Sequence, residues 1–311
     1  MTKRLRIGTR GSQLAMIQTG MVRDLLLRAH PDLQIEIVEI KTSGDWAPAH
    51  GETRLSEAEG GKGLFAKEIE AALLAEQIDC GVHSLKDMPS FLPDGLMIEH
   101  VLPREDPRDA LISSKSRTID SLPDGATVGT SSLRRQAMML AQRPDLKIVP
   151  LRGNVQTRID KLRAGQVDAT ILALAGLKRL GLEIDVASVI EIEDMLPAAC
   201  QGIVAIELRT ADIHWHKAFD SIHCTQTGLR AAAERAALQV LDGSCHTPIG
   251  AYSVLEDNNM TLDVVVLSED GQQVYRESKT APVATGAQAT SLGVVVGDIL
   301  KARVPPELLA A

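Results

Sequence analysis

Aromatic side chains are scarce in this sequence, at 2% of its 311 residues, so its cores must be built from Leu, Ile, Val, Ala and Met. The scarcity argues against a nucleic-acid surface, because such surfaces commonly stack bases on aromatic rings. No apolar run approaches the roughly 20 residues that span a bilayer. With 44% hydrophobic and 24% charged residues, the composition is typical of a folded soluble protein.

Cysteine is also sparse, and the four cysteines lie far apart, with no pair at metal-ligand spacing. They are Cys80, Cys200, Cys224 and Cys245. We therefore expect no bound metal. The basic N-terminus lacks the apolar run and cleavage site of a secretory signal, so we expect a cytoplasmic protein with free thiols.

Charge is unevenly distributed along the chain. Residues 130–179 hold ten Lys and Arg against three acidic residues, which makes this segment +7, whereas the net charge of −8 leaves −15 for the remainder. A concentrated basic stretch in an acidic protein indicates a local anion site. Solvated helix faces are the alternative explanation.

The pattern of apolar residues predicts alternating strands and helices, which is typical of α/β units. Strands are expected at 5–9, 33–40, 78–83, 147–151 and 168–174, with the end of another at 127–129. Helices are expected from Ser12 through Leu26, at 64–77, after Ser132 through Ala141, at 155–163 and at 175–180. Residues 42–63 hold six glycines and prolines and predict a long loop.

After about residue 221 the order of elements changes. A helix at 228–241 is followed by expected strands at 249–255, 261–267 and 273–278 and by a helix near 287–300. This order predicts a separate α+β domain.

Two similar junctions suggest an internal echo of two α/β domains. Ile7-Gly8-Thr9-Arg10-Gly11-Ser12 and Val128-Gly129-Thr130-Ser131-Ser132 both read as a strand, a Gly-Thr turn and a Ser-capped helix. Backbone N–H groups at such a helix start attract anions, and arginine forks suit carboxylates. Arg10 serves the first junction and Arg134 and Arg135 the second. Ordinary capping beside exposed arginines is the alternative.

Three further motifs are candidates for chemistry. Gly60-Gly61-Lys62-Gly63 lacks the spacing of a phosphate loop, so nucleotide binding is weakly supported. In Val-His-Ser-Leu-Lys-Asp-Met-Pro (82–89) an expected strand ends. The acidic residue that follows, Asp87, either forms a surface ion pair with Lys86 or is a carboxylate that stabilises a developing cation. His83 is expected to be a buried, hydrogen-bonded histidine. Cys245 lies in a Gly/Pro loop that a ligand could reach, whereas Cys80 and Cys200 lie in apolar surroundings and are interpreted as packing residues.

Together these segments resemble the porphobilinogen deaminase family, from about Leu5 to the C-terminal domain. The matching runs are Gly-Gly-Lys-Gly-Leu-Phe (60–65), Val-His-Ser-Leu-Lys-Asp-Met-Pro (82–89), Arg-Glu-Asp-Pro-Arg-Asp-Ala (104–110), Gly-Thr-Ser-Ser-Leu-Arg-Arg-Gln (129–136), Leu-Arg-Gly-Asn-Val (151–155), Ala-Gly-Leu-Lys-Arg-Leu (175–180) and Gly-Ser-Cys-His-Thr-Pro-Ile-Gly (243–250).

The resemblance implies an α/β protein with two periplasmic-binding-protein-like domains and a third, smaller α+β domain. The implied domains are 1–102 with 202–220, 103–201, and 221–311. It also implies a monomeric transferase that joins four molecules of porphobilinogen, with loss of ammonia, into hydroxymethylbilane. The primer is a dipyrromethane cofactor held by a thioether to Cys245.

The resemblance also assigns roles to residues. Asp87 would stabilise the cationic reacting pyrrole and help to move protons. Residues implied to hold the cofactor are Cys245, Ser84, Lys86, Asp87, Thr130, Ser131, Ser132, Arg134, Arg135, Arg152 and Gly153. Residues implied to bind substrate are Arg10, Ser12, Phe65, Arg152, Arg158, Leu172, Gly176, Arg179 and Gln201. The 42–63 loop would form a lid over the cleft.

Two positions depart from the family pattern. Cys200 stands where a small residue is common and is a candidate second reactive thiol, and Ala58 stands where some members carry a lysine. The rival hypotheses are a non-catalytic anion-binding protein of the same two-domain architecture and a nucleotide-dependent enzyme.

Overall fold

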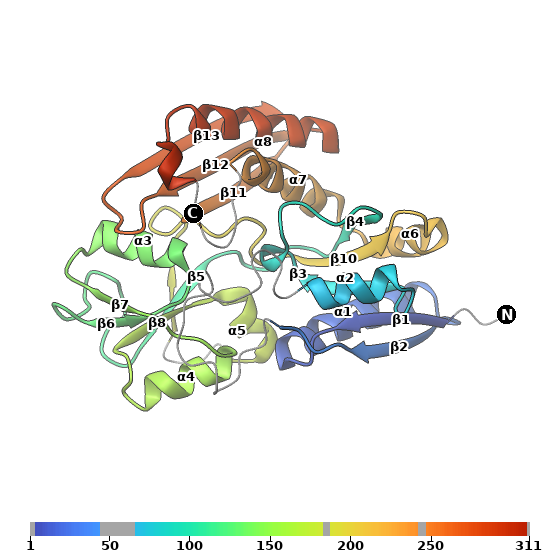
Figure 1. The fold of residues 1–311 in the computed structure, drawn as a ribbon, viewed down its shortest axis with the longest axis horizontal. Coiled ribbons are helices and arrows are strands. Elements are labelled where there is room, and N and C mark those ends of the chain that lie inside the picture. The colour runs from blue at the N-terminus through green and yellow to red at the C-terminus, as the bar shows by residue number, and fades with distance from the viewer. Residues whose placement is uncertain (1–3, 44–65, 183–186, 242–246, 310–311) are drawn as a thin grey trace.

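A computed structural model describes residues 4–43, 66–182, 187–241 and 247–309, and it contains three sheets (Figure 1). The predicted fold class, two α/β domains followed by a smaller α+β domain, is confirmed. The first sheet has the order β2-β1-β3-β10-β4, and the second has the order β7-β6-β8-β5-β9.

The first α/β domain carries the N-terminal elements and one returning segment. Its elements are β1 (Arg4–Thr9), α1 (Gln13–Ala29), β2 (Gln34–Glu39), α2 (Lys67–Leu74), β3 (Cys80–Ser84), the short helix η3 (Leu85–Asp87), β4 (Leu96–Val101), β10 (Val204–Arg209), α6 (Ile213–Phe219) and η4 (Asp220–Ile222). The second contains β5 (Asp109–Ser113), β6 (Thr127–Gly129), α3 (Leu133–Gln142), β7 (Lys147–Val149), α4 (Val155–Arg163), β8 (Ala169–Ala173), α5 (Leu174–Leu180) and β9 (Ala187–Ile190).

The two sheets share one strand-pairing pattern, which confirms the predicted similarity of the two α/β domains. β1 pairs in parallel with β2 and β3, and β6 pairs in parallel with β7 and β8. In each sheet the next strand is antiparallel: β10 lies between β3 and β4, and β5 lies between β8 and β9. The chain therefore returns to the first sheet after building the second. The residue boundaries of the domains stay a prediction that this return supports.

Helix starts follow the predicted capping residues. The Ser12 side chain accepts a hydrogen bond from the Ala15 N–H at the start of α1, and the Ser132 side chain accepts one from Arg135 at the start of α3. Such caps satisfy N–H groups that a helix leaves free in its first turn. The strands β4, β5, β9 and β10 and the helix α6 were not predicted.

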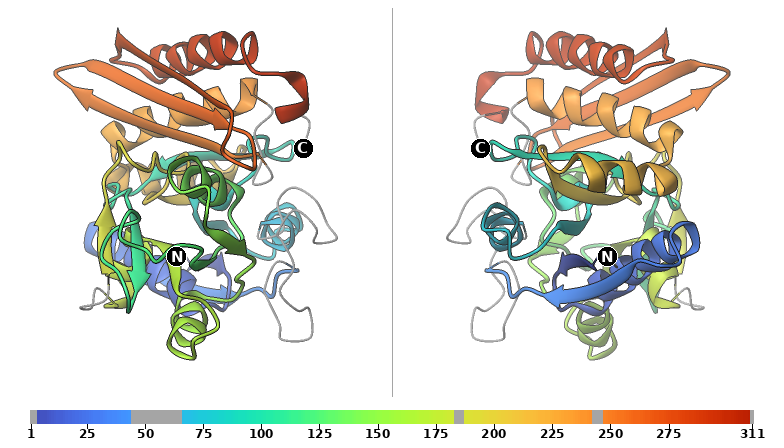
Figure 2. Two further views of the ribbon diagram at one scale, coloured as in Figure 1. Left: turned by 90° about the vertical axis from the view of Figure 1, so that its left-hand side faces the viewer. Right: turned by 90° about the vertical axis from the view of Figure 1, so that its right-hand side faces the viewer.

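The third domain packs across both α/β domains (Figures 1 and 2). Its elements are α7 (Thr225–Val240), β11 (Ile249–Glu256), β12 (Asn259–Leu267), β13 (Val274–Pro282), α8 (Gly286–Lys301) and η5 (Pro306–Leu308). Alternate residues of β12 face opposite sides of this sheet. Val264 and Val266 pack with α7 and α8, whereas Val265 and Leu267 join the core of the second domain. Ala231 of α7 packs with the first domain.

Across the described residues, the structure contains no helix both long and apolar enough to cross a bilayer.

Candidate functional site

A cleft of about 1020 Å³ lies between the two α/β domains, with residues of the third domain completing its wall. Most of the predicted site residues line it. From the first domain they are Arg10, Ser12, Ser84, Lys86 and Asp87; from the second they are Ser131, Ser132, Arg134, Arg135, Arg152, Gly153, Arg158, Leu172, Gly176 and Arg179; Gln201 lies on the returning segment.

Three helices whose first turn is capped by a side chain begin at the wall of this cleft. Their capping residues Ser12, Ser132 and Asn154 all line it, at the starts of α1, α3 and α4. The positive end of each helix dipole therefore faces the same space, which favours anions there. The predicted anion site at the two Gly-Thr junctions thus gains a third helix start, at Asn154.

Arg134 and Arg135 share one buried carboxylate, Asp109. One nitrogen of Arg134 lies 2.6 Å from Asp109 Oδ2, and one of Arg135 lies 2.8 Å from Oδ1. Burial alone would raise the pKa of Asp109, but the two guanidinium charges and their hydrogen bonds outweigh it and hold that pKa below its ordinary value. A charged Asp109 therefore fixes both arginines before any ligand arrives. Asp109 was missed, although it lies within the 104–110 motif.

Each of these arginines keeps a donor unused. The Nε atoms of Arg134 and Arg135 are buried and have no hydrogen-bond partner, and the same holds for Nε of Arg179. Native structures rarely leave buried donors unpaired, so such groups call for an explanation. Because these atoms are closed to solvent in this conformation, an anion in the cleft would reach them only after the side chains turn.

A hydrogen-bonded chain leads from Asp109 to Lys86. The Gln201 amide nitrogen donates to Asp109 Oδ1 at 3.0 Å, and its oxygen accepts from Lys86 Nζ at 3.2 Å. Burial lowers the pKa of the Lys86 ammonium to about 8, while the Asp87 carboxylate opposes that shift. Gln201 thereby joins a cation of the first domain to the arginine pair of the second.

The turn before α4 positions two more arginines. Gly153 has φ +112°, and a Cβ there would lie 2.7 Å from Thr157 Cγ2, so this position requires glycine. Arg158 Nε donates to the Gly153 carbonyl at 2.8 Å. Arg152, 7% exposed, precedes the turn and lines the cleft.

Asp87 ends the short helix η3, directly after β3. It is half-buried, lines the cleft, and forms no hydrogen bond or ion pair with any residue that the structure describes. Its neighbour Ser84 exchanges hydrogen bonds with the Gln18 side chain at 2.8 and 3.2 Å. Lys86 and Asp87 both lie in the cleft, which favours the cation-stabilising carboxylate over an ordinary surface pair.

Three predicted site residues do not appear in this lining. Thr130 is buried beneath it, and its hydroxyl accepts a hydrogen bond from the Ser132 N–H at 3.1 Å. Phe65 and Cys245 lie outside the described residues, as does most of the 42–63 loop. Thr247, two positions after Cys245, does line the cleft.

The remaining candidates behave as packing residues. His83 is 7% exposed and its Nε2 lies 3.0 Å from Glu207 Oε2, which confirms the buried, hydrogen-bonded histidine. Cys80 and Cys200 are buried, as predicted. Burial raises the pKa of the Cys200 thiol to about 12, so a second reactive thiol at Cys200 is not supported.

Comparisons with known proteins cover nearly the whole chain. Residues 5–217 match the family model described as "Porphobilinogen deaminase, dipyromethane cofactor binding domain", and residues 228–302 match "Porphobilinogen deaminase, C-terminal domain". The porphobilinogen deaminase of Paracoccus denitrificans (strain Pd 1222) is 46% identical, covering 97% of this chain and 95% of its own. The chloroplastic porphobilinogen deaminase of Oryza sativa subsp. japonica is 45% identical, covering 97% of this chain and 84% of its own.

Solved structures with similar coordinates are far more distant in sequence. The BenM effector-binding domain with benzoate is 16% identical and covers 71% of this chain and 90% of its own, with a TM-score of 0.42. A probable amino-acid transporter extracellular-binding protein of Bacillus subtilis is 12% identical and covers 75% and 97%, also with a TM-score of 0.42.

Proposed function

Because the chain belongs to the porphobilinogen deaminase family, we propose that its cleft joins four porphobilinogen molecules into hydroxymethylbilane, with loss of ammonia. The growing pyrrole chain is extended on a dipyrromethane primer held covalently by the protein. Each pyrrole of this chain carries an acetate and a propionate, so the ligand gains two carboxylates at every addition.

The observation that carries this proposal is the convergence of cations and helix starts on one cleft. Arg134, Arg135 and Arg152 line it from the second domain and Arg10 and Lys86 from the first, beside the starts of α1, α3 and α4. A lengthening polyacid needs many fixed donors of this kind. Solvated helix faces do not account for them, because Arg134, Arg135 and Arg152 are 4%, 6% and 7% exposed.

The residues present fit a dipyrromethane group. Arg134, Arg135 and Thr247 line the cleft and each keeps a buried polar atom without a partner, which the carboxylates of the group would satisfy once the side chains turn toward it. We propose that the holding residues are Ser84, Lys86, Asp87, Ser131, Ser132, Arg134, Arg135, Arg152 and Gly153, with Thr130 acting through Ser132. When bound, the group supplies the pyrrole α-carbon at which the chain grows.

Cys245 is the proposed point of attachment. Two residues of chain span at most about 7 Å, and Thr247, two positions along, lines the cleft. This supports a thiol within reach of the arginines. The buried Cys80 and Cys200 do not offer such a thiol.

Asp87 is the proposed catalytic residue. Its carboxylate lies in the cleft with no hydrogen-bond partner among the described residues, so it is available to the pyrrole N–H groups and to the cation left when ammonia departs. Arg10, Ser12, Phe65, Arg152, Arg158, Leu172, Gly176, Arg179 and Gln201 are the proposed contacts of the incoming pyrroles. We also propose a cytoplasmic monomer, as membership of this family implies.

Intact-protein mass spectrometry tests this function. We expect the purified chain to exceed its sequence mass by two pyrrole units, because the primer is covalent. Cys245→Ser should lack this excess, whereas Cys224→Ser, a change at a half-buried cysteine, should keep it. A bare mass for the unaltered protein would favour the non-catalytic anion-binding protein, whereas an unchanged excess in Cys245→Ser would place the attachment at another residue.

A further inference from the structure

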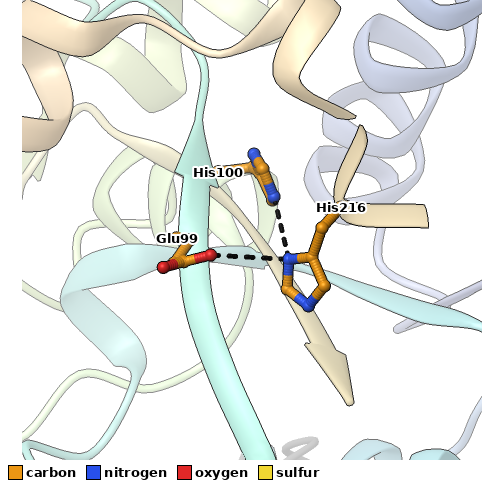
Figure 3. Close-up of side chains that lie close together, drawn as sticks. All are labelled: Glu99, His100 and His216. Carbon is orange, nitrogen blue, oxygen red and sulfur yellow. Dashed lines mark hydrogen bonds and ion pairs between the residues drawn. The ribbon is translucent and has the colours of Figure 1, made fainter. Parts of the chain in front are cut away.

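Two histidines and a glutamate meet on the first domain, away from the cleft (Figure 3). Glu99 and His100 lie on β4, and His216 lies on α6. His100 Nε2 is 3.1 Å from His216 Nδ1, and Glu99 Oε2 is 3.5 Å from the same atom. One ligand atom from each residue falls within 4.8 Å of the others, and within the described ranges only these three residues form such a group.

The backbone fixes the tautomer of His216. Its Nε2 lies 3.1 Å from the carbonyl oxygen of Arg209, which can only accept a hydrogen bond. The ring proton of neutral His216 therefore sits on Nε2, and the lone pair of Nδ1 faces Glu99 and His100. A histidine whose second nitrogen is held by a carbonyl is the usual arrangement for a metal ligand.

His100 is held less favourably. It is 3% exposed, and its Nε2 must donate to His216 Nδ1, so its own Nδ1 carries no proton. That Nδ1 is buried without a hydrogen-bond partner and lies 3.8 Å from the Asp220 carboxylate. Two hydrogen-bond acceptors, His100 Nδ1 and the Asp220 carboxylate, therefore face each other with no proton between them.

We propose that Glu99, His100 and His216 bind a divalent transition-metal ion of the zinc class. Ligand atoms about 2.05 Å from a tetrahedral zinc lie roughly 3.3 Å apart, close to the two separations measured here. Two imidazoles and a carboxylate suit zinc and leave a fourth position for water. The metal takes the place of the proton on His100 Nε2, and that proton moves to Nδ1 of the same ring, where it faces the Asp220 carboxylate at 3.8 Å.

The bound ion would join two elements that are distant in sequence. β4 is the edge strand of the first sheet, and α6 follows the returning strand β10. His100 and His216 are 116 positions apart, so no motif of fixed spacing could identify them from the sequence. The expectation of no bound metal rested on the cysteines alone. None of the three lines the cleft, so the role we assign to the ion is stabilisation of this edge.

Isothermal titration of the metal-stripped holoenzyme with zinc chloride tests the site. We expect one zinc ion per chain and a rise in the thermal midpoint on binding. Glu99→Gln keeps the shape of a mostly exposed side chain and should weaken binding at least tenfold, and His216→Gln should weaken it further. His214→Gln is the matched control, because His214 is exposed on the same helix and outside the cluster.

Cobalt substitution keeps the test open if His216→Gln fails to fold. Bound Co²⁺ should give a visible absorption band with the intensity of a four-coordinate site, and Glu99→Gln should alter or abolish it. The proposal is overturned if the unaltered holoenzyme shows no stoichiometric zinc binding. It is equally overturned if Glu99→Gln binds as tightly as the His214→Gln control.

Discussion

Asp109 illustrates how single side chains prepare the cleft. It is fully buried and holds one nitrogen each of Arg134 and Arg135, while Gln201 donates to it from the returning segment. Arginine side chains carry considerable rotamer entropy, which a ligand would otherwise have to remove. The carboxylate has fixed these two arginines in advance, and it leaves their buried Nε donors unpaired.

Asp87→Asn tests the proposed catalytic carboxylate by replacing one of its oxygens with an amide nitrogen. The amide keeps the shape but carries no charge, so we expect kcat for porphobilinogen consumption to fall by about 10²–10⁴-fold. The unfolding midpoint should hardly change. Asp94→Asn, at an exposed position outside the cleft lining, should retain full activity. Activity within tenfold of normal would remove Asp87 from the mechanism.

Glu70 predicts a dependence of stability on pH. Burial, and then the charge of Glu207, raises the pKa of Glu70 to about 7, while His83 opposes the shift. A raised carboxyl pKa means that the folded state binds the proton more tightly. Its stabilising effect is therefore complete below the ordinary value of 4.5 and is lost as the pH rises toward 7.

Glu70→Gln should remove this loss. Between pH 5 and pH 8 we expect the unaltered protein to lose on the order of 2 kcal/mol more unfolding free energy than the variant. Urea denaturation at both pH values measures it. Glu76→Gln, exposed just beyond the end of α2, should follow the unaltered protein, and parallel pH profiles for all three proteins would contradict the assignment.

Sequence reasoning found most side chains of the cleft but not their partners. Arg134 and Arg135 stand out because they follow a Ser cap, and Lys86 and Asp87 because they follow a strand. Gln201 was predicted from the family resemblance, but Asp109 becomes recognisable only when the fold brings β5 beside the returning segment, since the two residues lie 92 positions apart. The cluster of His100 and His216 was missed for the same reason.

Local signals decided which elements were predicted. Ser12, Ser132 and the periodicity after them marked α1 and α3, and the expected strands at 249–255, 261–267 and 273–278 marked the third sheet. β10 went unrecognised because its place depends on pairing with β3 and β4, which are distant in sequence. A short apolar run does not reveal its pairing partners.

The contact between α7 and α8 depends on a small residue. A Cβ on Gly293 would lie 2.2 Å from the Ala233 carbonyl oxygen and 2.7 Å from Ala236 Cβ, so the helices would have to separate. Overpacking of this kind costs about 1–3 kcal/mol, which exceeds the gain of about 1 kcal/mol in helix propensity.

Gly293→Ala should therefore lower the unfolding free energy by up to about 2 kcal/mol. Gly286→Ala is the matched control at the first residue of the same helix, where a Cβ meets no atom within 4 Å. It should be neutral or slightly stabilising. Thermal denaturation distinguishes the two variants, and equal midpoints would contradict the tight contact.

At the scale of the whole molecule, Glu234 of α7 joins the third domain to both chain segments that connect the α/β domains. It lies 2.6 Å from Arg104 on the first segment, accepts the Cys200 N–H on the second at 2.6 Å, and accepts the Ser253 N–H of β11 at 2.9 Å. Arg104 and Glu234 are both almost fully buried. Removing one partner of such a pair leaves a buried charge uncompensated.

Glu234→Gln should lower the unfolding free energy by about 3–5 kcal/mol, measured by urea denaturation. Glu277→Gln removes the partner of Arg303 in a more exposed pair within the third domain and should cost less than about 1 kcal/mol. Similar losses of unfolding free energy in the two variants would show that the buried Glu234 pair stabilises the fold no more than the exposed Glu277 pair.

The position of β10 also constrains the order in which ribosomal synthesis can complete the domains. β4 pairs with β10 alone among the described strands, and the whole second sheet lies between them in the sequence. The second sheet has all its strands once residue 190 has emerged, whereas the first still lacks β10. Nascent domains usually finish in N-terminal to C-terminal order, but here the middle of the chain can finish first. Until β10 is translated, β3 and β4 expose unpaired edges, the kind of surface on which nascent chains aggregate and to which chaperones bind.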